Sequence, residues 1–205
     1  MADIIHTPAA SNRDIARWLA AHITTALATA PEVAITVPGG STPFPVFEEL
    51  ARLDLPFARI AIWPGDDRIV PEDHPASNVG RIRALLQPVG ARIVPLAEGA
   101  APPRFAVALL GMGGDGHIAS LFPNTNPRAD APAQVLRLTP DPLPPEAPFD
   151  RLTLTIPALV NADAIAFLIR GEEKRAIFAA AAEGRNDLPV ARLLAATPAQ
   201  VTCFS

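Results

Sequence analysis

The strongest indication of the fold is the run Phe105-Ala106-Val107-Ala108-Leu109-Leu110, which is followed directly by Gly111-Met112-Gly113-Gly114-Asp115-Gly116-His117. Six consecutive apolar residues predict a strand that is buried on both faces, as in a parallel sheet. Four glycines among the next six residues disfavour any regular element, so the backbone must turn where the strand ends. Asp115 and His117 therefore lie in an unusual loop at the carboxyl end of a buried strand.

The rest of the chain repeats this alternation of strand and helix. Apolar runs predict strands at 33–37, 59–63, 92–94, 164–169 and 199–204, with an edge strand at 134–138 and a half-exposed strand at 152–156. Helical spacing and capping residues predict helices at 12–29, 76–87, 172–183 and 189–195, one after Pro43, and a short one beginning near Ile118. We expect a single α/β domain over residues 1–205, Rossmann-like, with a mostly parallel sheet flanked by helices.

Composition excludes several classes of partner. The 17 basic and 21 acidic residues give a net charge of −4, which is not the basic footprint that a nucleic acid requires. No run approaches the 18 apolar residues of a membrane span, and the N-terminus lacks the pattern of a secretory signal. Cys203 is the only cysteine, so no internal disulfide can form. We expect a cytoplasmic protein that binds neither nucleic acid nor membranes.

The unusual sequences all follow predicted strands, where parallel sheets bind their ligands. The first is the turn Gly39-Gly40-Ser41-Thr42. Its glycines let backbone N–H groups approach a ligand, its hydroxyls add donors, and the helix that follows favours an anion. We interpret this turn as a phosphate cradle, although an ordinary capped turn between strand and helix would have similar residues.

The second is a polar loop in which six titratable side chains lie within the nine residues from Asp66 to His74. The paired acids Asp66 and Asp67 beside Arg68 could position a cation or a sugar, and Arg68 could bind phosphate or stabilise an oxyanion. The alternative is a solvated surface loop, with Ser77-Asn78 capping the next helix.

The remaining candidates are His117 and Lys174. A histidine fixed in a glycine-rich loop suits general-base work on water. Lys174 is the only lysine among the 17 basic residues and lies in the first turn of a predicted helix. A cation there is unfavourable because the N-terminal end of the helix dipole is also positive, and a bound anion nearby would remove this repulsion. We interpret Lys174 as a second phosphate ligand, with a solvated surface lysine as the alternative. No spacing of histidines or cysteines supports zinc, so no metal is expected.

Together these segments resemble the 6-phosphogluconolactonase family, in the family's order and over residues 33–185. The resemblance is most specific in the glycine-rich segment, which continues after His117 as Ile118-Ala119-Ser120-Leu121-Phe122-Pro123. The related glucosamine-6-phosphate deaminases share the fold but continue towards Ala-Phe-Asn-Glu-Pro, so the lactonase is favoured. This chain has Asp67 where the family usually has glutamate, and we assign Asp67 no direct role.

The resemblance implies hydrolysis of 6-phospho-D-glucono-1,5-lactone to 6-phospho-D-gluconate, in the oxidative pentose phosphate pathway. This reaction needs no cofactor or metal, and we expect a monomer because nothing in the sequence demands an assembly. We expect His117 to act as the base, Asp115 to orient it or hold a sugar hydroxyl, and Arg68 or loop N–H groups to meet the oxyanion. Substrate binding is assigned to Gly39, Gly40, Ser41, Thr42, Asp66, Arg68 and Lys174. The alternatives are a glucosamine-6-phosphate deaminase or isomerase and a non-catalytic sugar-phosphate sensor.

Overall fold

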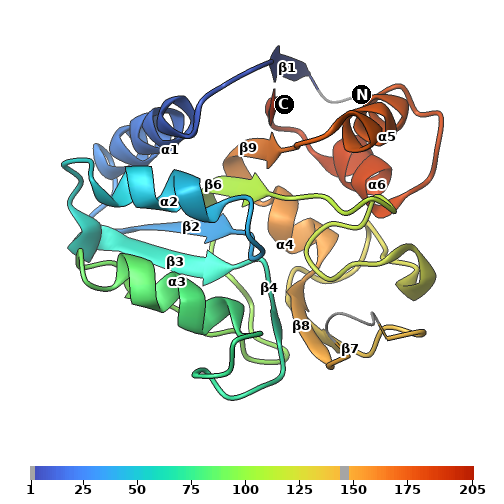
Figure 1. Cartoon of the computed structure of the whole chain (residues 1–205), viewed down its shortest axis with the longest axis horizontal. Coiled ribbons are helices and arrows are strands. Elements are labelled where there is room, and N and C mark those ends of the chain that lie inside the picture. The colour runs from blue at the N-terminus through green and yellow to red at the C-terminus, as the bar shows by residue number, and fades with distance from the viewer. Residues whose placement is uncertain (1–2, 144–147) are drawn as a thin grey trace.

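A seven-stranded sheet, parallel throughout, forms the centre of the protein (Figure 1). The computed structural model describes residues 3–143 and 148–205. In spatial order the strands are β1 (Ile4–Thr7), β10 (Val201–Phe204), β9 (Ala162–Leu168), β6 (Phe105–Leu110), β2 (Val33–Val37), β3 (Ile60–Pro64) and β5 (Arg92–Ile93). The expected α/β class with a parallel sheet is confirmed.

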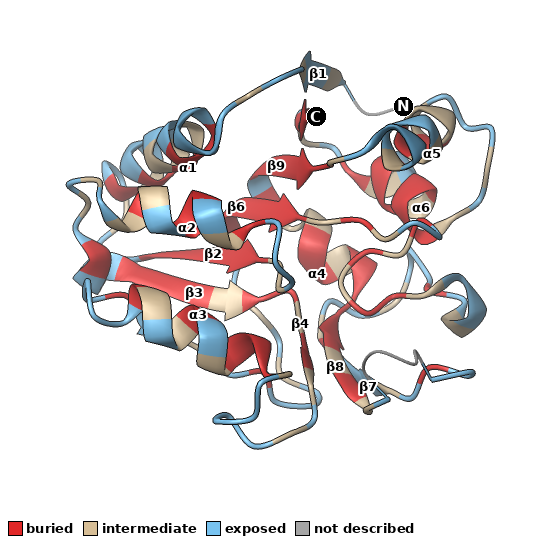
Figure 2. Ribbon diagram, in the orientation of Figure 1, coloured by how far each residue is buried: buried red, intermediate tan, exposed pale blue. Residues whose placement is uncertain are grey.

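Helices cover both faces of this sheet. One face packs against α1 (Asn12–Leu27), α2 (Phe44–Ala51) and α3 (Asn78–Leu86). The other packs against α4 (Ile156–Val160), α5 (Glu172–Ala182) and α6 (Pro189–Ala196). Successive strand residues serve opposite faces, so Ile165 joins the core under α4–α6 and Ala166 joins the core under α1–α3. This double coverage explains the uninterrupted apolar runs, and the five inner strands β10, β9, β6, β2 and β3 are buried almost throughout (Figure 2).

A second, antiparallel sheet of three strands lies beside the first. Its order is β4 (Asp66–Arg68), β8 (Arg151–Leu154) and β7 (Val135–Leu138). The prediction of an irregular loop at Asp66–Arg68 was wrong, because β8, far along the chain, supplies the pairing partner. The prediction that β8 is half-exposed was also wrong, since three of its four residues are buried. The edge strand β7 is confirmed.

Other local predictions fail for identifiable reasons. The short helix expected near Ile118 is absent: Ile118 and Leu121 form an isolated antiparallel bridge, and Ala119 has a φ of +49° that is incompatible with a helix. A 3₁₀ turn, η2 (Pro123–Thr125), follows instead, and another, η1 (Phe57–Arg59), precedes β3. β1 was not predicted, because this short edge strand exists only through its pairing with β10. Among the described residues no helix is long and apolar enough to cross a membrane.

Leu109→Ala tests the central position of β6. Leu109 is fully buried in the core beneath α1–α3, so its truncation should lower the free energy of unfolding by about 3 kcal/mol. Leu136, in the edge strand β7, is 39% exposed, and Leu136→Ala should change the unfolding free energy far less. Urea titrations of both variants measure the difference, and equal midpoints would contradict this placement of the core.

Candidate active site

The site lies where the strand order reverses. After β2 the chain adds β3 and β5 on one side of the sheet, whereas after β6 it adds β9 and β10 on the other. The loops that leave β2 and β6 therefore diverge, which opens a crevice at the carboxyl edge of the sheet. A cavity of about 340 Å³ occupies this position.

Four neighbouring strands, in the order β3, β2, β6 and β9, deliver the segments that line this cavity. The predicted residues that line it are Gly39, Gly40, Ser41, Thr42, Asp66, Arg68, His117 and Lys174. Asp115 does not line it and lies behind the imidazole of His117. Two polar lining residues, Asn78 and Arg170, were missed: Ser77-Asn78 was explained equally well by helix capping, and Arg170 was assigned no role beside Lys174.

The imidazole of His117 is held in a fixed orientation. Its Nδ1 lies 2.6 Å from Oδ1 of Asp115, and the same oxygen accepts the backbone N–H of His117 at 3.1 Å. On the far side the ring packs on Phe122, with 4.6 Å between the ring centroids. When Nδ1 carries the proton that bonds to Asp115, Nε2 keeps its lone pair. Nε2 has no hydrogen-bond partner within residues 3–143 and 148–205.

Gly113 explains why this loop needs glycine. A β-carbon at Gly113 would lie 2.2 Å from both Cε1 and Nδ1 of His117 and 2.7 Å from Oδ1 of Asp115. The imidazole therefore lies against bare backbone. The loop closes on itself through a hydrogen bond of 2.9 Å from the N–H of Gly113 to the carbonyl of His117.

The β4 segment faces two ways, because its side chains alternate. Asp66 and Arg68 line the cavity. Asp67 points to the start of α3, is only 8% exposed, and accepts the N–H groups of Arg68 (2.8 Å), Asn78 (2.6 Å) and Val79 (3.0 Å). Burial raises the pKa of the Asp67 carboxyl, and the three backbone N–H donors oppose that rise.

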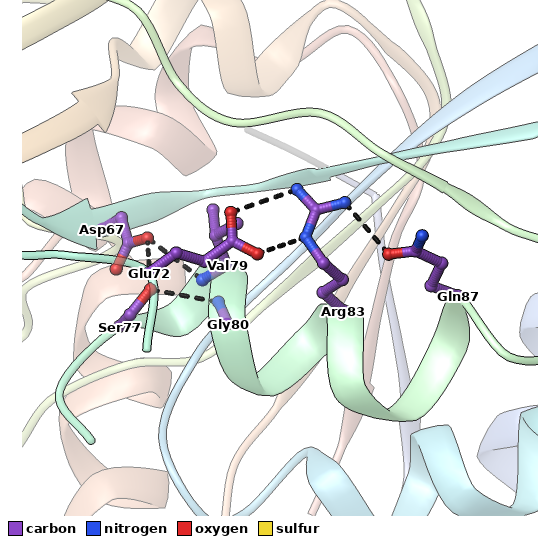
Figure 3. A network of polar contacts seen from close by, with 7 residues as sticks. All are labelled: Asp67, Glu72, Ser77, Val79, Gly80, Arg83 and Gln87. Carbon is purple, nitrogen blue, oxygen red and sulfur yellow. Dashed lines mark hydrogen bonds and ion pairs between the residues drawn. The ribbon is translucent and has the colours of Figure 1, made fainter. Parts of the chain in front are cut away.

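Side chains around Asp67 tie the same loop to α3 (Figure 3). Ser77 caps the helix: its hydroxyl accepts the N–H of Gly80 at 3.0 Å and donates to Asp67 at 3.3 Å. Further along α3, Arg83 pairs with Glu72 and donates to Gln87 at 3.1 Å. The capping interpretation thus holds for Ser77, whereas the side chain of Asn78 enters the cavity.

Positive charge predominates among the lining groups. Arg68, Arg170 and Lys174 contribute three cations, and Asp66 is the only carboxylate among the described residues that line the cavity. The guanidinium of Arg170 is anchored by a 3.0 Å bond to the carbonyl of Ala10. Such a cavity attracts an anion. No three His, Cys, Asp or Glu side chains of the described residues converge into a group that could hold a metal ion.

Known proteins resemble this chain over most of its length. Residues 6–102 and 89–203 match the family model described as glucosamine-6-phosphate isomerases/6-phosphogluconolactonase. The chain belongs to this family.

Members of the family from several bacteria are similar in sequence and fold. The 6-phosphogluconolactonase of Caulobacter vibrioides is 35% identical over 206 residues, covering 87% of this chain and 85% of that protein. That of Mesorhizobium japonicum is 34% identical, covering 93% and 88%. The crystal structure of a 6-phosphogluconolactonase from Shewanella baltica superposes with a TM-score of 0.80 at 26% identity and covers 99% of this chain and 97% of that one. The resemblance noted in the sequence is thereby confirmed.

Asp67→Asn tests whether the buried carboxylate anchors α3. An amide nitrogen cannot accept the hydrogen bonds that one carboxylate oxygen receives from Val79 and Ser77. The variant should therefore lose about 2 kcal/mol in the free energy of unfolding. Asp73→Asn, in the exposed part of the same loop, is the control and should change it by less than about 0.5 kcal/mol. Thermal or urea unfolding measures the stability of both variants, and equal stabilities of Asp67→Asn and Asp73→Asn would refute the anchoring role.

Proposed function

We propose that this protein hydrolyses 6-phospho-D-glucono-1,5-lactone to 6-phospho-D-gluconate. The observation that carries the proposal is one cavity in which a histidine backed by a carboxylate lies with three cations and a glycine turn. The histidine and its carboxylate suit the activation of water, and the cations and the glycine turn suit the binding of a phosphate. Relatives named 6-phosphogluconolactonase, 34–35% identical over most of the chain, support the same reaction.

The phosphate is assigned to the end of the cavity formed after β2 and β9. Ser41 and Thr42 offer hydroxyl donors, the Gly39–Gly40 backbone allows close approach, and Lys174 supplies a compact ammonium. Arg170, which the sequence had not suggested, adds a guanidinium held by the carbonyl of Ala10. This end of the cavity would select for a doubly charged phosphate over a neutral sugar hydroxyl.

The lactone carbonyl is assigned to the end near His117. Nε2 of His117 takes a proton from water while the water oxygen forms a bond to C1. The C1 oxygen becomes an oxyanion, which Arg68 or loop N–H groups stabilise. Collapse of this intermediate breaks the bond from C1 to the ring oxygen, and the imidazolium returns its proton to that oxygen as it becomes a hydroxyl. Asp115 orients the imidazole and stabilises its positive charge.

The expected partner and compartment follow from this substrate. We propose that the enzyme acts as a monomer, because the proposed reaction calls on no residue beyond the cavity described above. We place the enzyme in the cytoplasm, because a phosphorylated lactone is charged and does not cross membranes unaided. It must then be hydrolysed in the compartment where it is made.

His117→Ala tests the base. The lactone should be generated in situ and its disappearance followed against the spontaneous rate. The variant should lose about 10²–10⁴-fold in kcat, with little change in thermal stability because the side chain is 30% exposed. His74→Ala, which alters an exposed histidine outside the cavity, should retain activity.

Other results of that assay would select other functions. Turnover of glucosamine 6-phosphate rather than the lactone would identify a deaminase or isomerase. Tight binding of 6-phosphogluconate with no turnover of either compound would identify a sensor.

Lys174→Ala and Arg170→Ala test the phosphate end. Each removes a charged donor whose hydrogen bond to an anion is worth about 1.5–3 kcal/mol, so each should raise KM by roughly 10- to 100-fold. Arg175→Ala is the matched control, because Arg175 adjoins Lys174 in α5 but is exposed and does not line the cavity. Steady-state kinetics separate the three, and an effect of equal size in all of them would point to general electrostatics instead.

A further inference from the structure

Asp66 and Arg68 form an unusual pair. They lie two residues apart on β4, so their side chains leave the same face of the strand, and both line the cavity. Opposite charges so placed would be expected to pair. Within the described part of the chain, however, no ion pair joins them.

The amide of Asn78 bridges the two residues instead. Its Oδ1 accepts a hydrogen bond of 2.8 Å from Nη1 of Arg68. Its Nδ2 donates to the backbone carbonyl of Asp66 at 2.8 Å and lies 3.4 Å from that residue's Oδ1. Asn78 is only 1% exposed. A side-chain amide carries an acceptor and donors in one neutral group, so it can satisfy both residues without adding charge.

Asp66 has a second partner that keeps it occupied. The hydroxyl of Ser120, in the segment after His117, donates to Oδ2 of Asp66. Asp66 therefore accepts hydrogen bonds from Asn78 at the start of α3 and from Ser120 after the His117 loop, and it does not need Arg68 as a partner.

This arrangement leaves part of the Arg68 guanidinium available. Nη1 is used twice, by Oδ1 of Asn78 and by the carbonyl of Ala76 at 3.1 Å. Within the described part of the chain neither Nε nor Nη2 has a hydrogen-bond acceptor, and Nε is shielded from solvent. A charged donor buried without an acceptor is unfavourable, but a substrate oxygen cannot reach the shielded Nε. Because Arg68 lines the cavity, Nη2 is the donor that an oxygen of a bound substrate can reach.

The same amide also contacts the glycine turn. A β-carbon at Gly39 would lie 2.0 Å from Oδ1 and 2.4 Å from Nδ2 of Asn78. Only a residue without a side chain allows this approach. Asn78 thus fixes the position of Arg68 relative to the turn after β2.

We propose that Asn78 is a positioning residue: its amide separates Arg68 from Asp66 and holds the guanidinium ready for an oxyanion of the substrate. The inference rests on the proposed lactonase function for its substrate. Asn78 itself need not contact the reacting atoms, because it acts through Arg68.

Asn78→Ala is the principal test. The substitution keeps the backbone N–H that bonds to Asp67, so the start of α3 stays anchored. We expect at least a tenfold loss in kcat/KM for the lactone and at least a tenfold weaker binding of 6-phosphogluconate by calorimetry. Ser11→Ala is the control: it removes the corresponding side-chain cap of α1, away from the cavity, and should lower the melting temperature without changing kcat/KM. If Asn78→Ala behaves as Ser11→Ala does, the role is structural and the proposal is wrong.

A double-mutant cycle with Arg68→Ala tests whether the effect passes through the arginine. In the Arg68→Ala background, Asn78→Ala should cause less than a twofold further loss in affinity for 6-phosphogluconate. Independent, multiplying effects would overturn the proposal. Because affinity is measured without turnover, this result is separate from the lactonase assay, in which an inactive wild type would refute the proposed function alone.

Asn78→Asp supplies a further measurement. The variant has nearly the same shape but places a carboxylate against Arg68 and Asp66. It should bind 6-phosphogluconate at least tenfold more weakly than the wild type, because the new charge pairs with the guanidinium. Unchanged affinity in a folded Asn78→Asp protein would contradict the need for a neutral bridge.

Discussion

The buried carboxylate of Asp67 is the contact on which the geometry of the site depends. It accepts three backbone N–H groups and the Ser77 hydroxyl, and two of those N–H groups belong to the first residues of α3. Hydrogen bonds thereby fix a short polar strand to the start of a helix. Because strand side chains alternate, fixing Asp67 towards the helix turns Asp66 and Arg68 towards the cavity.

The parallel sheet supplies the second constraint. Its strands all point the same way, so every loop that leaves a carboxyl end emerges at one edge, and the reversal between β2 and β6 keeps two of these loops apart. The glycine turn, the His117 loop and the Lys174 helix meet there although they are far apart in sequence. The rigidity of the buried strands holds charged groups together that would otherwise repel.

Charged groups are spread over separate parts of the cavity wall. Arg170 and Lys174, from the segment after β9, are assigned to the phosphate, and the imidazole of His117 is paired with Asp115 outside the cavity. Between them, Asn78 lets Asp66 and Arg68 share the wall without pairing. A neutral amide thus keeps a cation available near the proposed reaction centre.

Local signals in the sequence, namely apolar runs and glycine-rich strand ends, were enough to predict the α/β class, the buried strands and most of the polar side chains of the cavity. Gly39, His117 and Lys174 could be named without a structure. The strand pairing of β4 could not, since its partner β8 is distant in sequence, and neither could β1, which needs β10. Asn78 looked like part of a helix cap, and only the tertiary structure brings its amide between Arg68 and Gly39. Hydrogen bonds between remote segments leave no periodic pattern in a sequence, so their partners are decided only when the chain folds.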